Sequence, residues 1–118
     1  MMAASLFDYE MFKAKIIEAN KDYLINSIYD VDGSIDQMVS LQIDGYKLVS
    51  VYAESSSPMI FTVEFSYDGN HWFTMDTSQN PMTTYNNEFE TGAIYVRLKS
   101  TGTGNQGDKV TLIITAKR

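Results

Sequence analysis

The chain of 118 residues has no cysteine, one histidine and one tryptophan. Without cysteine, the sequence excludes disulfides, thiolate catalysis and cysteine-ligated zinc. A single imidazole also leaves carboxylates to supply every other ligand of any histidine-based metal site. Basic residues are few as well, because nine Lys and Arg stand against fifteen Asp and Glu for a formal net charge of -6. Nucleic acids and anionic membranes are bound by clustered basic side chains, so we expect neither as a partner.

Long hydrophobic runs are also missing from the sequence. No stretch approaches the roughly 20 apolar residues that span a bilayer, so we expect no membrane insertion. The first twenty residues, MMAASLFDYEMFKAKIIEAN, lack the cationic start and the continuous apolar stretch of a secretory signal. We therefore expect no signal peptide and a cytoplasmic origin, with any place in a virion or on another outer surface reached by assembly or lysis.

Segments in which apolar and polar residues alternate fill most of the chain. Residues 59–65 read MIFTVEF, which places four apolar side chains on one face of a strand and Thr62 and Glu64 on the other. Residues 93–99 and 109–116 alternate in the same way. Turn-forming clusters separate such segments at residues 55–58, 76–81 and 101–107.

A tight turn is predicted at Asp44-Gly45, because this dipeptide suits the positive dihedral angles of a two-residue hairpin. The turn lies between two further strand candidates, residues 38–43 and 47–52, and predicts that they pair as a hairpin. The whole pattern predicts a single all-β domain over residues 1–118. We expect an antiparallel, jelly-roll-like β-sandwich of about eight strands.

The first thirty residues allow two interpretations. Ser5 could cap a helix that carries acids in its first turns and lysines later, as the helix dipole favours. Phe12, Ala14 and Ile16 also alternate, which favours a strand from about Met11, followed by a second strand over residues 23–29. The strand interpretation is slightly preferred, with residues 1–11 as an arm or a short helix.

His71 is the obvious catalytic candidate, because it is the only imidazole in the chain. The sequence offers it no cysteine and no serine in a nucleophile-elbow setting to activate. Residues 101–107 contain glycines but lack the lysine and the following helix of a phosphate loop. We therefore expect His71 to be a solvated loop residue and the protein not to be an enzyme.

A calcium loop is conceivable in the stretch DVDGSID, residues 30–36. Carboxylates at alternate positions around a glycine can direct several oxygens at one hard cation. The spacing departs from the EF-hand pattern, because the glycine comes early and no glutamate closes the loop. A solvated acidic turn without a cofactor is the preferred interpretation; the alternative calcium ligands would be Asp30, Asp32, Ser34 and Asp36.

Aromatic side chains provide a second possible site. Exposed tyrosine and tryptophan can stack on sugar rings or anchor a protein interface, since each has a wide apolar plane and one polar tip. In a sandwich, many aromatics instead belong to the core or to cross-strand pairs. If the protein binds a glycan, we expect the platform to consist of Tyr67, His71, Trp72 and Tyr85.

The run FTVEFSYDGNHW, residues 61–72, has the form of a strand, then S-x-D-G-x-x-W, then a second strand. It resembles the hairpin of discoidin-type sandwich domains, and residues 93–100 resemble a later strand of those domains. The same hairpin is similar to one in small β-sandwich proteins of phage and prophage virions. The resemblance implies a β-sandwich fold and carries over no ligand-binding loop. From the residues alone, Asp68 is expected to accept amide hydrogen bonds, Gly69 to take positive dihedrals and Trp72 to cover the hairpin.

The preferred function is therefore a non-enzymatic structural or attachment module, such as a virion or surface-assembly component, that forms a homo-oligomer or assembles with other structural proteins. The apolar residues Leu6, Phe7, Met11 and Phe12 need a surface for burial, which a neighbouring subunit or the core of the same chain could supply. The alternative is a carbohydrate-binding module that uses exposed aromatics.

Overall fold

Eight antiparallel strands make up the part of the protein that the structure describes. A computed structural model describes residues 22–118. Its strands are β1 (Tyr23–Asp32), β2 (Gln37–Gln42), β3 (Leu48–Met59), β4 (Phe61–Ser66), β5 (Trp72–Thr77), β6 (Met82–Glu90), β7 (Tyr95–Ser100) and β8 (Lys109–Lys117). Within residues 22–118, no helix is long and apolar enough to cross a membrane.

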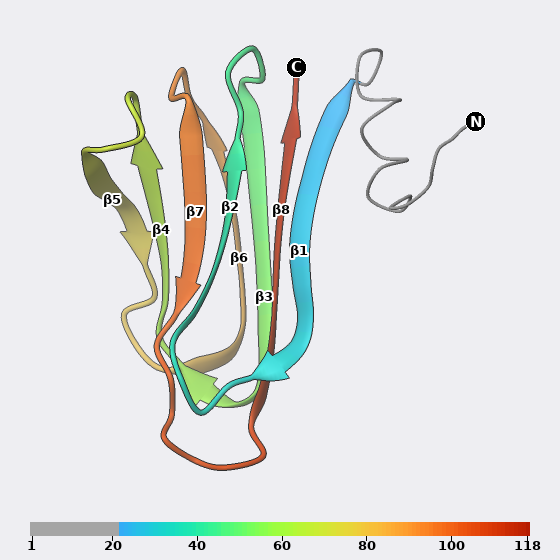
Figure 1. Cartoon of the computed structure of the whole chain (residues 1–118), viewed down its shortest axis with the longest axis vertical. Coiled ribbons are helices and arrows are strands. Elements are labelled where there is room, and N and C mark those ends of the chain that lie inside the picture. Colours follow the sequence, from blue (N-terminus) through green and yellow to red (C-terminus); the bar gives the residue numbers. More distant parts are fainter. Residues whose placement is uncertain (1–21) are drawn as a thin grey trace.

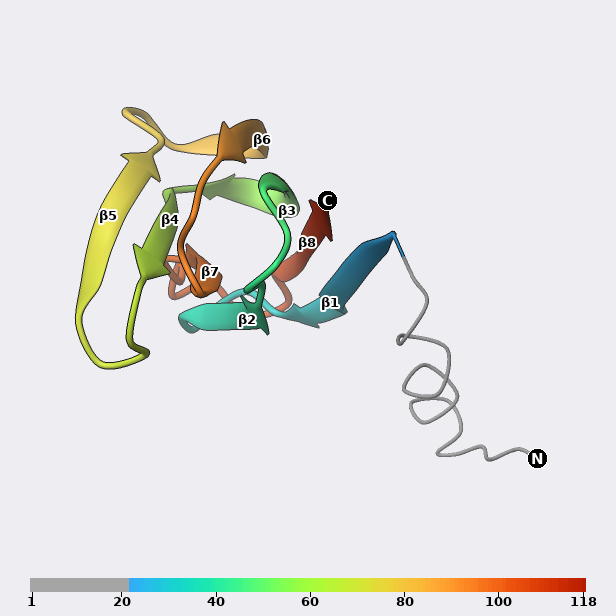
Figure 2. The same cartoon turned by 90° about the horizontal axis from the view of Figure 1, so that it is seen from above.

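The strands form two four-stranded sheets (Figure 1). Sheet A has the order β1-β8-β3-β6 and sheet B the order β2-β7-β4-β5. Strand β1 therefore pairs with β8, β2 with β7, β3 with β6 and β4 with β5, as though one long hairpin had been wrapped around a core. This wrapping is a jelly roll. The predicted all-β sandwich is confirmed, and Figure 2 shows both sheets curving around its interior.

The core lies between the two sheets. Apolar and polar residues alternate along each strand, so the apolar face of every strand points toward this core. Phe61, Val63 and Phe65 of β4 are almost completely buried, and so are Val96 and Leu98 of β7. Strand β8 contributes Val110, Leu112, Ile114 and Ala116 from the opposite sheet. Alternate residues of the same strands consequently face outward, and these residues form the two outer faces of the sandwich.

Polar side chains tie the two sheets together at both sides of the sandwich. On one side, the Asn26 amide of β1 donates a 2.7 Å hydrogen bond to the Ser40 carbonyl of β2. On the other, the Asp76 carboxylate of β5 accepts from the Tyr85 hydroxyl at 2.5 Å and from the Asn87 amide at 3.0 Å, both on β6. Burial and the bond to Asp76 raise the pKa of the Tyr85 hydroxyl well above its usual value.

The prediction that residues 38–43 and 47–52 pair as a hairpin around Asp44-Gly45 is wrong. Gly45 has a φ of 90°, and the Tyr46 amide bonds to the Ile43 carbonyl, so a turn does form. However, the turn carries the chain from sheet B to sheet A. Strand β2 pairs with β7 instead, and β3 pairs with β6 and β8. The residues of a turn therefore determine where the chain bends, but they do not determine which strand each flanking segment pairs with.

The predicted break at residues 55–58 is also wrong, because β3 continues to Met59. Pairing with β8 extends as far as Ser55 opposite Val110, and the register to β6 shifts between Glu54 and Met59. This irregularity accommodates Pro58 inside a strand, because a bulge needs no amide donor there. The predictions for residues 1–21, including the arm, lie outside the described residues.

Candidate binding groove on the outer face of sheet B

The outward-facing residues of sheet B form rows across its four strands. Strand β7 turns Val96 and Leu98 to the core, so its alternate residues face outward. The register aligns these with outward residues of the neighbouring strands. One row is Gln42, Tyr95, Ser66 and Trp72; the next is Ser40, Arg97, Glu64 and Thr74; the third is Met38, Lys99, Thr62 and Thr77.

The turn between β4 and β5 is held by its own side chains. The Ser66 hydroxyl accepts hydrogen bonds from the amides of Asp68 and Gly69 at 3.3 and 2.8 Å. Asp68 accepts from the amides of Asn70 and His71, each at 2.8 Å. These amide bonds, together with the His71 ring, hold the pKa of the Asp68 carboxyl far below its usual range. Gly69 has a φ of 83°, so the hairpin geometry expected from the sequence is confirmed.

Trp72 lies beneath a charged cluster on this face. The Arg97 guanidinium sits 3.9 Å from the centroid of the Trp72 ring, a cation–π contact. Its Nε also bonds to Glu64 Oε1 at 2.5 Å, and Lys99 lies 3.4 Å from the other Glu64 oxygen. Burial acts to raise the pKa of the Glu64 carboxyl, but the hydrogen bond and charges of Arg97 and Lys99 outweigh it and lower the pKa.

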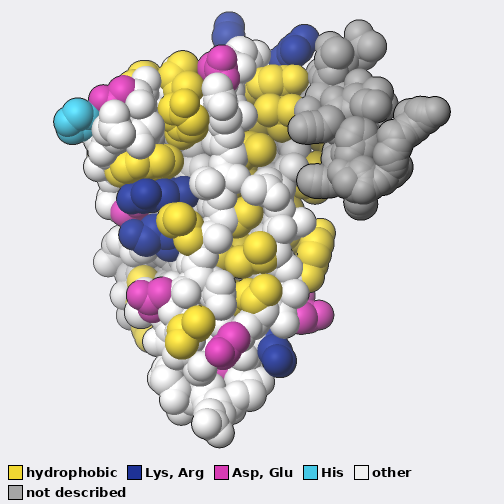
Figure 3. Space-filling view, viewed as in Figure 1, with side chains coloured by type: hydrophobic (Ala, Val, Ile, Leu, Met, Phe, Trp, Pro, Cys, Tyr) yellow, Lys and Arg dark blue, Asp and Glu magenta, His cyan; other side chains and the backbone are white. Residues whose placement is uncertain are grey.

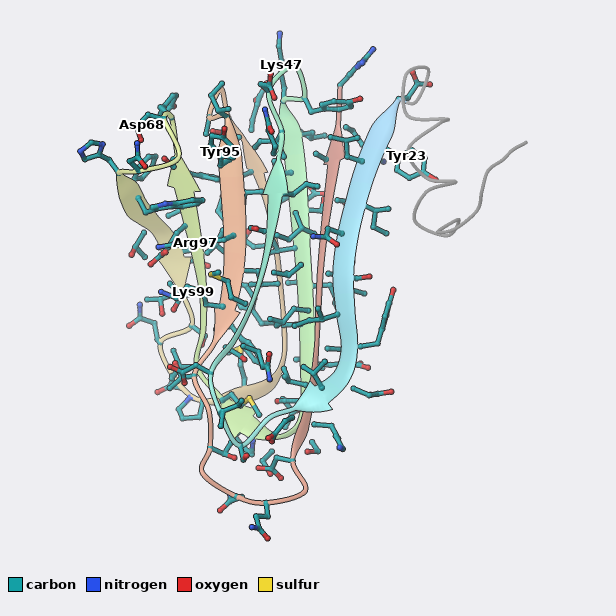
Figure 4. The ribbon with its side chains drawn as sticks, in the orientation of Figure 1. Tyr23, Lys47, Asp68, Tyr95, Arg97 and Lys99 are labelled. Carbon is teal, nitrogen blue, oxygen red and sulfur yellow. The ribbon has the colours of Figure 1, made fainter. Side chains whose placement is uncertain are left out.

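Figure 4 shows Tyr95, Arg97 and Lys99 following one another down β7, with Asp68 on the hairpin turn to one side. In the same orientation, Figure 3 shows Lys and Arg side chains gathered over β4 and β7 with hydrophobic surface beside them. The residues of this face are therefore arranged as a basic centre bordered by aromatic rings.

A groove of about 510 Å³ runs beside this cluster, between β2 and the β4–β5 turn. Its lining combines two aromatic rings with amide, hydroxyl and carboxylate groups. The lining residues are Ser40, Leu41, Gln42, Asp68, Gly69, Asn70, Trp72 and Tyr95. Tyr95 lies so close to Gly69 that a Cβ there would sit 3.2 Å from its ring. The aromatic wall is thus packed directly on the turn, which fixes the shape of the groove.

The four aromatic residues predicted for a glycan platform do not come together. Trp72 lines the groove, and His71 lies at the turn, 89% exposed, with its Nδ1 2.6 Å from Asp68. Tyr67 is exposed but stacks on Phe73, with ring centroids 6.0 Å apart, outside the groove lining. Tyr85 is buried between the sheets, where it bonds to Asp76.

Each of the four candidate calcium ligands takes part in a hydrogen bond within the protein, through its side chain or, for Asp30, through its backbone amide. Asp32 accepts from the Ser34 hydroxyl and amide, and these bonds lower the pKa of its carboxyl. Asp36 accepts from the Gly102 amide, and the Asp30 amide donates to Thr111. Among residues 22–118, no three His, Cys, Asp or Glu side chains converge as a metal site. The structure therefore adds no support to calcium binding, which stays the less favoured alternative to a solvated acidic turn.

Tyr95, Arg97 and Gln42 are residues of this face that the sequence-based interpretation missed. Each belongs to a strand outside the S-x-D-G-x-x-W motif, and only sheet pairing brings them onto the same face as Trp72. A signal was nevertheless present, since residues 95–99 alternate an aromatic and two cations with Val96 and Leu98. Two like charges and a tyrosine on the polar side of a strand can mark a functional face.

No protein-family model and no curated protein sequence matches this chain. Solved structures do share its fold. The SPBc2 prophage-derived protein YomS has a TM-score of 0.57 at 10% identity, over 80% of this chain and 95% of that one. The PBSX exported protein XepA has a TM-score of 0.58 at 13% identity, over 80% of this chain and 37% of XepA.

A further similar structure is the module CpGH89CBM32-6, produced by Clostridium perfringens. Its TM-score is 0.51 at 14% identity, over 85% of this chain and 98% of the module. At such low identity, these similarities establish the β-sandwich fold that prophage-derived proteins and this module share. The fold agrees with the resemblance to phage β-sandwich proteins.

Proposed function

We propose that this protein is a non-enzymatic attachment module of a phage-type particle, and that the groove on sheet B holds a saccharide. The groove carries the proposal, because it places Trp72 and Tyr95 beside the Gln42 and Asn70 amides and the Ser40 hydroxyl. Sugars present one apolar face and a rim of hydroxyls, which this combination of rings and polar groups complements.

The size and construction of the groove support the same proposal. Its volume lies within the range of about 300–1,000 Å³ that is usual for small-molecule sites. Internal hydrogen bonds of the turn hold the wall formed by Asp68, Gly69 and Asn70. A site whose wall is already ordered loses little conformational entropy on binding. No cofactor is part of the proposal.

The particle and the assembly state belong to the proposal as well. The fold shared with prophage-derived YomS and with the PBSX protein XepA favours a place in a virion. We propose that the chain works there as a homo-oligomer, because several weak saccharide sites on one particle act together through avidity. The other non-enzymatic candidate is a purely structural protein of the particle that binds no saccharide.

The single tryptophan gives a direct measurement, since Trp72 lines the groove and its fluorescence reports occupancy. Titration of a panel of bacterial surface oligosaccharides should change this fluorescence for at least one member. Tyr95→Ala should weaken that binding about tenfold or more, which corresponds to about 1.4 kcal/mol. Gln42→Ala, at an exposed position, should weaken it by a smaller factor.

Tyr67→Ala is the matched control, because it removes an exposed tyrosine that does not line the groove. It should bind the same oligosaccharide as tightly as the wild-type chain. The proposal fails if Tyr95→Ala, still folded by circular dichroism, binds as well as the wild type. A panel that never changes the Trp72 signal would favour the ligand-free structural role.

A further inference from the structure

Two cations of β7 continue the groove of sheet B along the strand. Tyr95 is part of the groove lining, and Arg97 and Lys99 follow it on the same face, because alternate residues of a strand share a face. Figure 4 shows the three residues in this order down β7. Successive positions lie about 6.8 Å apart, since each residue of a strand rises about 3.4 Å. A ligand that leaves the groove along β7 therefore passes over both cations.

Arg97 adjoins the groove without lining it. It lies directly opposite Ser40, which lines the groove from β2, and its guanidinium sits 3.9 Å from the ring centroid of Trp72, which lines it from β5. Its Nε donates to Glu64, and this is the one hydrogen bond of the guanidinium within the described chain. The terminal nitrogens of a guanidinium are donors as well, so they stay available to a ligand.

Lys99 carries the more accessible of the two positive charges. Its side chain is 41% exposed, against 24% for that of Arg97. Lys99 Nζ lies 3.4 Å from the second oxygen of Glu64, a long contact that leaves the ammonium with further donors. Two cations thus share one carboxylate, so this end of the groove has a surplus of positive charge in a protein whose formal net charge is -6.

The opposite end of the groove carries a carboxylate that the turn already satisfies. Asp68 Oδ1 accepts from the amides of Asn70 and His71, and Asp68 Oδ2 lies 2.6 Å from His71 Nδ1. The groove is therefore asymmetric in charge, with an acid at the β4–β5 turn and the surplus cation on β7. A ligand with an acidic group is attracted at one end and repelled at the other, which fixes its orientation.

We propose that the saccharide of this groove is acidic, and that Arg97 and Lys99 bind a carboxylate or phosphate group on it. The inference rests on the proposed function and names the chemical class of its ligand. The sugar lies against Tyr95 and Trp72, and its anionic oxygens accept hydrogen bonds from the terminal nitrogens of Arg97 and from Lys99 Nζ. Such charge-assisted bonds are stronger than those between neutral groups, and carboxylate and phosphate share the chemistry that they require.

Two matched pairs of probes test the inference on the full chain, with Trp72 fluorescence as the signal. One pair is oligogalacturonate and its neutral methyl ester; the other is a phosphorylated malto-oligosaccharide and the same malto-oligosaccharide without phosphate. At least one acidic probe should bind about tenfold or more tightly than its neutral partner. The pair that shows the difference identifies carboxylate or phosphate as the source of the charge.

Lys99→Met is the test variant, because it removes the charge and leaves the contact between Arg97 and Trp72 in place. It should weaken binding of the acidic probe about fivefold to tenfold, and Lys99→Arg should retain the binding. Lys109→Met is the matched control, since it removes the same charge from an exposed position on β8 in sheet A. It should bind the acidic probe as tightly as the wild type does.

Salt provides a measurement that needs no variant. Raising the NaCl concentration from about 50 to about 500 mM should weaken binding of the acidic probe to the wild-type chain and leave binding of a neutral probe unchanged, because salt screens charges near the surface. Affinity for the acidic probe that is independent of salt would contradict a contact with Arg97 and Lys99.

The remaining outcomes separate this inference from the proposed function. A neutral probe that binds as tightly as its acidic partner overturns the acidic ligand and leaves a saccharide groove standing. A Lys99→Met chain that is folded by circular dichroism and binds the acidic probe like the wild type also overturns it. An oligothymidylate that binds more tightly than every saccharide would assign the cations to nucleic acid instead. If no probe changes the Trp72 signal, the inference and the saccharide groove both fail.

Discussion

The two outer faces of the sandwich arise from the same strand alternation but use it differently. On sheet B, the outward residues contact one another: Glu64 bonds to Arg97, and Arg97 covers Trp72. On sheet A, the side chains of Ile25 and Ile113 adjoin separate polar pairs, in which the Tyr52 hydroxyl bonds to Glu54 and the Ser50 hydroxyl to Glu88. On sheet B the contacts join β4, β5 and β7 into one cluster beside an aromatic-lined groove, which suits the recognition of a polar ligand, whereas on sheet A each bond joins a single pair of side chains.

Among the variants considered, Arg97→Met on the outer face of sheet B should cause the largest loss of stability. Methionine can still cover Trp72, but Glu64 keeps only the longer contact to Lys99. We expect the free energy of unfolding to fall by about 1–3 kcal/mol, because a largely buried carboxylate loses its main partner. Urea denaturation measures the change. Lys117→Met, on sheet A, should stay within about 0.5 kcal/mol; an equal loss in both variants would contradict the contrast.

Gly69→Ala should have the next largest effect. A residue with a side chain pays about 1–2 kcal/mol at positive φ, and the new Cβ would press on the Tyr95 ring at 3.2 Å. Gly45→Ala is the matched control, because its φ is 90° and no atom lies within 4 Å of the added carbon. Both variants should lose stability, but only Gly69→Ala should change Trp72 fluorescence. An unchanged spectrum would mean that Tyr95 adapts without altering the groove.

Lowering the pH should reduce the stability of the protein gradually, and by less than the substitutions at Arg97 and Gly69. The folded-state pKa values of Asp68 and Glu64 are both lowered, so their contribution is complete above the usual carboxyl pKa near 4 and is lost as the pH falls below it. Thermal unfolding between pH 6 and pH 2 follows this loss. Asp68→Asn should make the unfolding temperature less dependent on pH, and a profile identical to the wild type would rule out a role for Asp68.

The smallest effect is expected for Tyr67→Ala. Its ring is 61% exposed and stacks on Phe73, so its removal should cost only about 0.5–1 kcal/mol. Urea denaturation again gives the value. A loss above about 2 kcal/mol would show that this tyrosine supports the β4–β5 hairpin more than its exposure indicates.

The local parts of the fold could be predicted, and the long-range pairing could not. The alternation in residues 59–65 indicated β4, and the Asp-Gly turn at Asp68 indicated the hairpin that follows it. The turn at Gly45 was also foreseen, but its flanking strands pair with segments far along the chain. Pairing depends on how whole strands fill the core, which a local turn does not encode.

The residues of the candidate groove likewise include some that the sequence predicted and others that it did not. Trp72 was recognised from its motif, whereas Tyr95 reaches it only through the β4–β7 register, in which Ser66 lies between them. Tyr85 failed as a platform residue because an aromatic at a strand position can face either side. Its burial and its stacking on the core residue Phe61 show that it faces inward. Period-two patterns with mixed apolar and polar neighbours leave that choice open.

The pairing of the first and last strands has a mechanical consequence. Tyr23 lies opposite Lys117, and the Arg118 amide bonds to the Asp22 carbonyl, so the two ends of the described chain meet at one end of the β1–β8 ladder. Tension applied between Asp22 and Arg118 would load these hydrogen bonds one pair at a time, as in opening a zipper. The sandwich should therefore yield at low force in that direction, while β4 and β7 keep their pairing and the groove its shape.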